Sequence, residues 1–148
     1  MRAKPHERSL LDIDRDEALA LAATAPVGRV VHSCGDRLFV TPVNVALEGS
    51  DVLARTAADS ELLAAARRAA PAAVEFDDLV EWSHSGWSVL IRGHLTEITD
   101  SGDIEHLLRT GPRPWSRRTG DSFVRLVGTE VTGRRIESGP GSVDTVFV

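Results

Sequence analysis

The strongest constraint on the fold is a succession of short β-rich runs, separated by tight turns and interrupted by few helices. Residues 28–33 and 38–47 flank the turn sequence CGDR, and the turn sequence EGSD leads into a third run at residues 52–56. Further runs cover residues 72–76, 86–100 and 122–128. Antiparallel meanders of this kind close into barrels or strongly curved sheets. We therefore expect a mainly β fold of antiparallel strands with a few covering helices.

Three helices are predicted between these runs. Asp14 is placed to cap the first, which ends before Pro26. The second runs from Ser60 to Ala69, and the third covers residues 102–110. The glycine-punctuated segment from residue 130 onward is expected to be a tail with a possible terminal strand.

The chain of 148 residues has the length of one domain. We expect a partly ordered N-terminal arm at residues 1–13, one β domain at residues 14–137 and a C-terminal tail at residues 138–148. A net charge of -5 argues against a nucleic-acid partner. Cys34 has no second cysteine to pair with, and no apolar run reaches the roughly 18 residues of a membrane span. With no secretory h-region near the N-terminus, we expect a cytoplasmic protein without membrane association.

Motifs for the common catalytic and metal sites are missing from the sequence. It contains no GxGxxG, GxxxxGK[ST], CxxC or HExxH, and the five histidines lack ligand spacing. Glu75 and Asp77 share one strand face, where acid–base work is the alternative to a solvated strand end. We therefore expect no metal ligands and assign no catalytic side chain.

Three segments are rich in arginine, aromatic residues or both. RTAADSELLAAARR, residues 55–68, has the layout of a phosphate site at a strand end and helix start, or of an ordinary capped helix that is exposed to solvent. GWSVLIRGHL, residues 86–95, carries an arginine in mid-strand that could extend to solvent. GPRPWSRRTGD, residues 111–121, is a loop suited either to cover a planar anionic ligand or to contact another subunit.

Together these segments resemble the pyridoxamine 5'-phosphate oxidase-like family of split β-barrels, specifically its actinobacterial flavin/deazaflavin oxidoreductase relatives. The resemblance extends from about residue 14 to residue 136. It rests on six segments in the family's order: APVGRVVHSCGDRLFVTPVNVAL, VLARTAADSELLAAARR, AAVEFDD, GWSVLIRGHLTEITD, PRPWSRRTGDSFVRL and VTGRRI. It implies an FMN-binding split β-barrel that forms a homodimer, with the cofactor sites at the interface.

The resemblance also implies which positions bind the cofactor. VTPVN matches the strand that lies along the isoalloxazine ring, and RT matches the strand that contacts the phosphate. The positions carried over are Pro42, Val43, Asn44, Arg55, Thr56, Ser60, Glu61, Trp87, Arg92, Trp115 and Arg118.

Glu61 departs from the family pattern, because the matching position is commonly a lysine. At a partly exposed site this charge reversal would cost on the order of 1–3 kcal/mol of phosphate binding. Replacing Glu61 by lysine is therefore expected to tighten FMN binding several-fold.

The function implied is a flavin-dependent oxidoreductase that acts on a small-molecule substrate, with FMN as cofactor or the deazaflavin coenzyme F-420 as the alternative. A second reading is a non-catalytic dimer that binds or sequesters the cofactor through a weakened phosphate site. Oxidation of pyridoxamine phosphate itself is less favoured, because this chain lacks much of the C-terminal substrate-binding region that the enzyme is expected to have.

Overall fold

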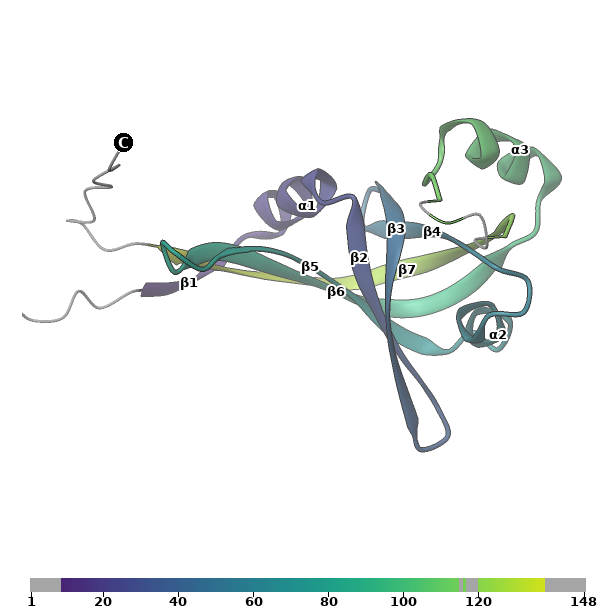
Figure 1. Cartoon of the computed structure of the whole chain (residues 1–148), viewed down its shortest axis with the longest axis horizontal. Helices are drawn as coiled ribbons and strands as arrows, with labels where there is room; N and C mark the ends of the chain where they lie inside the picture. The colour runs from purple at the N-terminus through teal and green to yellow at the C-terminus, as the bar shows by residue number, and fades with distance from the viewer. Residues whose placement is uncertain (1–8, 115, 117–119, 138–148) are drawn as a thin grey trace, which may run out of the picture.

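The computed structural model describes residues 9–114, 116 and 120–137 (Figure 1). The elements follow one another along the chain as β1 Ser9–Ile13, α1 Arg15–Thr24, β2 Val27–Cys34, β3 Arg37–Glu48, β4 Asp51–Thr56, α2 Glu61–Arg67, β5 Pro71–Val80, β6 Ser85–Ile98, α3 Ser101–Thr110 and β7 Ser122–Glu137. None of the described helices is long and apolar enough to span a membrane.

The strands form one antiparallel sheet that closes on itself. Its order is β1-β7-β4-β3-β2-β5-β6, and a further pairing of β7 with β6 completes the barrel. Strands β6 and β7, of 14 and 16 residues, run along most of the molecule (Figure 1). Near one end β7 pairs with β4, and near the other it pairs with β1. The expected mainly β, antiparallel split β-barrel is confirmed.

A bulge lets the two long strands bend around the barrel. The register of β6 against β7 shifts between Arg92 and Gly93. A Cβ atom on Gly93 would lie 1.8 Å from the carbonyl oxygen of Val127, so the backbones can meet this closely only at a glycine.

The helices close the core. Asp14 caps α1 as expected by accepting a hydrogen bond from the backbone N–H of Glu17 at 2.8 Å, and Ala18 and Ala22 of this helix are fully buried. Helix α2 buries one face against the barrel interior, with Leu63 inaccessible to solvent. It ends at Arg67, two residues before the expected Ala69, which adopts a positive φ of 51°.

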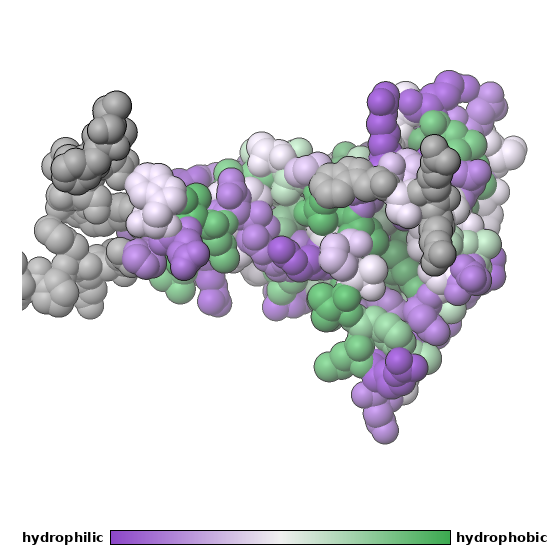
Figure 2. Space-filling model, viewed as in Figure 1, coloured by the Kyte–Doolittle hydropathy of each residue, from purple (hydrophilic) through white to green (hydrophobic). Residues whose placement is uncertain are grey.

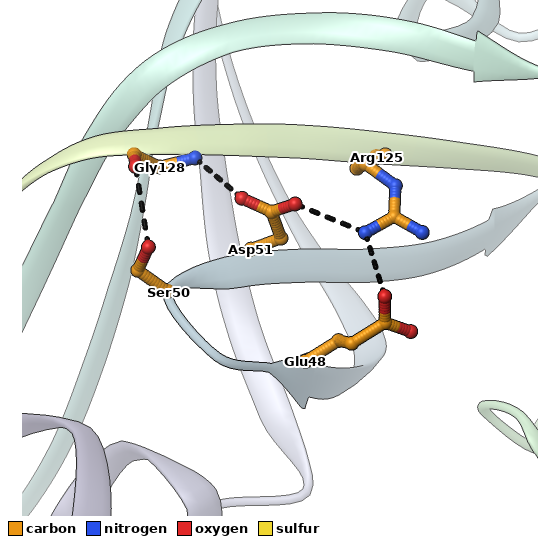
Figure 3. A network of polar contacts seen from close by, with 5 residues as sticks. All are labelled: Glu48, Ser50, Asp51, Arg125 and Gly128. Atoms are coloured by element: carbon orange, nitrogen blue, oxygen red, sulfur yellow. Dashed lines mark hydrogen bonds and ion pairs between the residues drawn. The ribbon is translucent and has the colours of Figure 1, made fainter.

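A polar network fastens the β3–β4 turn to β7 (Figure 3). One carboxylate oxygen of Asp51 accepts from the backbone N–H of Gly128 at 3.0 Å, and the other lies 3.0 Å from Arg125. Glu48 reaches the same guanidinium at 3.2 Å, and Ser50 donates to the Gly128 carbonyl at 3.3 Å. The network holds β4 and β7 together where their pairing ends.

Two segments differ from the sequence expectation. Residues 9–13 of the expected arm form β1, and residues 130–137, which follow the last predicted strand, continue β7 as regular strand. Gly133 packs against Ile13 and Ala18, with a Cβ there only 2.6 Å from Ile13. This glycine therefore permits close packing of β1 and α1 and does not interrupt the strand.

The β2–β3 hairpin projects from the barrel (Figure 1). Its turn is Gly35–Asp36, and Gly35 has the positive φ of 57° that such turns require. Leu38 and Val40 on this hairpin are 78% and 62% exposed, and hydrophobic surface is visible along it in Figure 2.

Candidate functional site

A pocket of about 400 Å³ lies where β3, the end of β4 and the segment after α3 meet. Its lining residues are Val27, Thr41, Pro42, Val43, Asn44, Arg55, Thr56, Ala57, Pro114 and Ser116. The structure thus brings together five residues that the sequence singled out on two separate strands. The volume lies within the roughly 300–1,000 Å³ typical of small-molecule sites.

Strand β3 offers a free edge to this pocket. Residues Thr41–Asn44 pair with β2 on one side, whereas β4 pairs with β3 only through Val45–Glu48. On the side opposite β2, no strand in the described part of the chain pairs with Thr41–Asn44. A free edge presents backbone N–H and C=O groups, which suits a flat ligand with polar edges.

Asn44 links this edge to the segment after α3. Its side-chain amide donates a hydrogen bond to the carbonyl oxygen of Arg113. The contact holds the segment containing Pro114 beside β3, so that the pocket has a second wall.

Arg55 supplies the positive charge of the pocket. Its side chain is 15% exposed, and it is the only charged side chain among the described lining residues. The Nε atom donates to the Gly120 carbonyl at 2.9 Å, Nη2 pairs with the Asp121 carboxylate, and the guanidinium carbon lies 5.6 Å from the centroid of the Phe123 ring. These contacts fix Arg55 at the pocket edge.

Thr56 and Ser60 form a hydroxyl pair. The Thr56 hydroxyl donates to Ser60 Oγ at 2.8 Å, and Ser60 Oγ accepts from the backbone N–H of Leu63 at 3.0 Å. Ser60 therefore caps α2 and is not among the pocket-lining residues, and neither is the exposed Glu61. Of the two hydroxyls, only that of Thr56 belongs to a residue that lines the pocket.

The other cofactor-binding positions that the resemblance implied are not among the described residues that line this pocket. Trp87 packs against the hydrophobic core. Arg92, 3.4 Å from Glu130, lines two other cavities of about 300 and 370 Å³ together with Arg134. Trp115 and Arg118 fall outside the described residues.

Glu75 and Asp77, the alternative acid–base pair, both contact one arginine. Arg29 Nη1 lies 3.0 Å from Glu75 and 2.6 Å from Asp77. Burial raises the pKa of Glu75 above its ordinary value, the neighbouring Asp77 adds to the increase, and Arg29 opposes it. The two carboxylates are thus held in an ion-pair cluster outside the pocket described above.

Several lining residues were not among the sequence-derived positions: Val27, Thr41, Ala57, Pro114 and Ser116. Two signals in the sequence could have found some of them. Thr41 stands inside the VTPVN segment, and Val27 faces Asn44 across a hairpin whose register the CGDR turn fixes. Pro114 and Ser116 belong to the GPRPWSRRTGD loop that the sequence indicated as a cover for a ligand or a subunit contact, but local sequence does not specify that this loop returns to β3.

Residues 14–135 match the pyridoxamine 5'-phosphate oxidase family. The chain belongs to this family. The resemblance noted in the sequence is thereby confirmed over most of the chain. An uncharacterized protein of Mycobacterium tuberculosis, Rv0080, is 34% identical over 140 residues, which cover 91% of each chain.

Solved structures share the fold of this chain. A FAD binding protein from Mycobacterium smegmatis superimposes with a TM-score of 0.69 at 30% identity, over 84% of this chain and 97% of that one. A FAD-binding protein from Mesorhizobium loti gives a TM-score of 0.75 over 89% of this chain and 100% of that one. At 17% identity, the second likeness shows the shared fold alone.

Proposed function

We propose that the protein is a flavin-dependent oxidoreductase. The observation that carries this proposal is the single pocket that combines the free edge of β3 with Arg55 and Thr56 of β4. An isoalloxazine ring needs a slot with polar edges, and its ribityl phosphate needs a cation and hydrogen-bond donors. Family membership and the likeness to the FAD binding protein from Mycobacterium smegmatis support the same assignment.

One group of lining residues suits the isoalloxazine ring of such a cofactor, and another suits its phosphate. Pro42 and Val43 supply apolar surface and backbone groups for the ring, while Arg55 supplies the cation for the phosphate. Asn44 keeps the second wall in place through Arg113 and so limits the access of water. When bound, the flavin supplies hydride transfer, and the protein's part is to bind, orient and shield it.

The cofactor is proposed to be FMN, with FAD and the deazaflavin coenzyme F-420 as the alternatives to be tested. An absorption spectrum of the purified protein, followed by titration with each compound, identifies which one binds. Reduction of the bound flavin band by a nicotinamide or small-molecule donor, followed by reoxidation, is the expected sign of an oxidoreductase. Failure of every flavin to bind would contradict the proposal.

A non-catalytic flavin-binding protein is the second candidate, favoured by the pairing of Arg55 with Asp121. The carboxylate already occupies part of the guanidinium that the phosphate would use. Saturable flavin binding without reduction by any donor would support this candidate over the oxidoreductase.

We also propose that two copies complete the site. Gly133 faces α1, so by strand alternation Thr132 and Arg134 lie on the opposite face of the sheet. We call this the open face. In the strand register of this face, Arg134 of β7 lies opposite Ser88 of β6, and Ser88 lies opposite Asp77 of β5. Glu75, two residues before Asp77, lies opposite Arg29 of β2.

The open face continues to the pocket, because Arg29 of β2 is the cross-strand partner of Pro42. Arg92 also lies on this face, on β6, three strands from β3. With neighbouring strands about 4.8 Å apart, that separation is roughly 14 Å along the sheet. A twofold axis through the open face would let Arg92 of each chain reach the pocket of the other.

Subunit complementation tests this arrangement. Arg55→Ala and Arg92→Ala are each expected to weaken FMN binding. If Arg92 acts across the interface, mixed dimers of the two variants contain one intact site, and about one quarter of all sites recover the wild-type affinity after random mixing. No recovery on mixing would place Arg92 and Arg55 in the same chain's site or remove Arg92 from it.

A further inference from the structure

The positive charge of the pocket is compensated within the chain. Arg55 is the only charged side chain among the described lining residues, and its Nη2 atom pairs with the carboxylate of Asp121. Asp121 does not line the pocket, and its side chain is 71% exposed. The carboxylate therefore approaches the guanidinium from the solvent side.

The fold fixes Asp121 in this place. Arg55 and Phe123 are cross-strand partners in the β4–β7 pairing, and the guanidinium lies over the Phe123 ring. Just before Asp121, a Cβ atom on Gly120 would lie 2.9 Å from Ala57 Cα and 3.2 Å from the Thr56 carbonyl oxygen. Close packing of Gly120 on the pocket edge thus sets the position of Asp121.

We propose that Asp121 determines how strongly the site distinguishes phosphorylated from unphosphorylated flavins. This inference rests on the proposed flavin-binding function. A flavin phosphate carries a charge of about −1.5 to −2 at neutral pH, so it competes with the carboxylate for Arg55 and is repelled by it. Riboflavin lacks the phosphate and meets neither effect. Asp121 thereby lowers the preference for the phosphorylated cofactor.

The test is Asp121→Asn, which removes the charge with little change in shape. FMN and riboflavin are titrated into the wild type and the variant at low and high salt. Glu105→Gln is the matched control, because it makes the same change in net charge at a 73% exposed site on α3. Unchanged riboflavin affinity shows that the pocket of the variant is intact.

Asp121→Asn is expected to tighten FMN binding on the order of tenfold at low salt, with a smaller gain at high salt and no change for riboflavin. Glu105→Gln should leave both affinities unchanged. An unchanged ratio of FMN to riboflavin affinity in Asp121→Asn would overturn the inference. Weaker FMN binding would also overturn it and make Asp121 a residue that positions Arg55.

The two proposals fail in different ways. If the wild type binds flavin but the ratio does not respond to Asp121→Asn, only this inference is overturned. If neither the wild type nor the variant binds FMN or riboflavin, the flavin-binding function is overturned and this inference with it.

Discussion

Arg55 and Glu61 are six positions apart, yet they have different surroundings. Arg55 is largely buried at the pocket edge, whereas Glu61 is exposed on the first turn of α2 and does not line the pocket. The hydroxyl of Ser60, which precedes Glu61, is engaged as the helix cap. The negative charge of Glu61, which stands where the family commonly has a lysine, therefore lies outside the pocket.

Glu61→Lys is accordingly expected to change FMN affinity by less than about twofold, since an exposed charge outside the pocket is screened by solvent and salt. This is smaller than the several-fold gain that the family pattern alone suggested. Fluorescence titration of FMN into both proteins measures the difference. A several-fold gain that fades with salt would mean that Glu61 does face the phosphate.

Glu75 provides a prediction about pH. Because burial raises its pKa above the ordinary value of 4.5, the protonated carboxyl is favoured in the folded protein. The stability that the protonated Glu75 contributes is fully present when the pH is below its ordinary pKa. It is lost as the pH rises through the raised pKa of the folded protein. Glu75→Gln mimics the protonated form, so its melting temperature should rise relative to wild type as the pH goes from below 4.5 towards neutrality.

Glu105→Gln provides the comparison for Glu75→Gln, because its carboxylate is exposed and pairs only with Arg109 in the described structure. A parallel trend in both variants would show that the general loss of a negative charge, and not the Arg29 cluster, causes the effect.

At the residue scale, the family resemblance in the sequence pointed to those pocket-lining residues that follow one another along a strand. Pro42, Val43 and Asn44 form one such group on β3, and Arg55 and Thr56 form another on β4. Asp121 could not be predicted, because it is 66 positions from Arg55 and meets it only through the β4–β7 pairing.

At the element scale, β7 joins the two ends of the fold. It pairs with β4 near its start, with β1 near its end and with β6 along most of its length. The network in Figure 3 lies where β7 leaves β4, and Asp51 is its central member because it bonds both Arg125 and the backbone of Gly128.

Asp51→Ala is expected to lower the free energy of unfolding by about 1–3 kcal/mol, because it removes the acceptor of the Gly128 backbone N–H and one of the two carboxylates that contact the part-buried Arg125. Asp51 is 26% exposed, whereas Glu48, on the same arginine, is 64% exposed. Glu48→Ala should therefore cost less than about 1 kcal/mol. Chemical denaturation of the two variants gives the comparison, and equal losses would contradict the central role of Asp51.

The pattern of β-rich runs and turns was enough to predict β2 to β6 and the three helices, because each has its own periodicity or cap. It did not predict β1 or the second half of β7. The glycine in the sequence VTGRRI indicated a break, but this residue, Gly133, in fact permits the close approach of Ile13 and Ala18. Such tertiary contacts are not encoded in local propensity.

At the scale of the whole molecule, the pocket and the open face lie on one continuous surface of the sheet. We expect the protein in solution to be a homodimer of twice the 16.0 kDa chain mass, because a second copy would cover this face and bring Arg92 to the pocket. Light scattering at micromolar concentration measures the mass. A monomer under these conditions would contradict the two-chain site but leave the pocket within each chain unaffected.

Calorimetric titration of FMN into the wild type and Arg55→Ala shows whether a flavin phosphate binds at Arg55. Loss of the charge-assisted hydrogen bonds is expected to weaken FMN binding roughly ten- to a hundredfold and riboflavin binding far less. Arg109→Ala, which removes a 64% exposed arginine from α3, should have the wild-type affinity. Saturable FMN binding that is unchanged in Arg55→Ala would contradict the account.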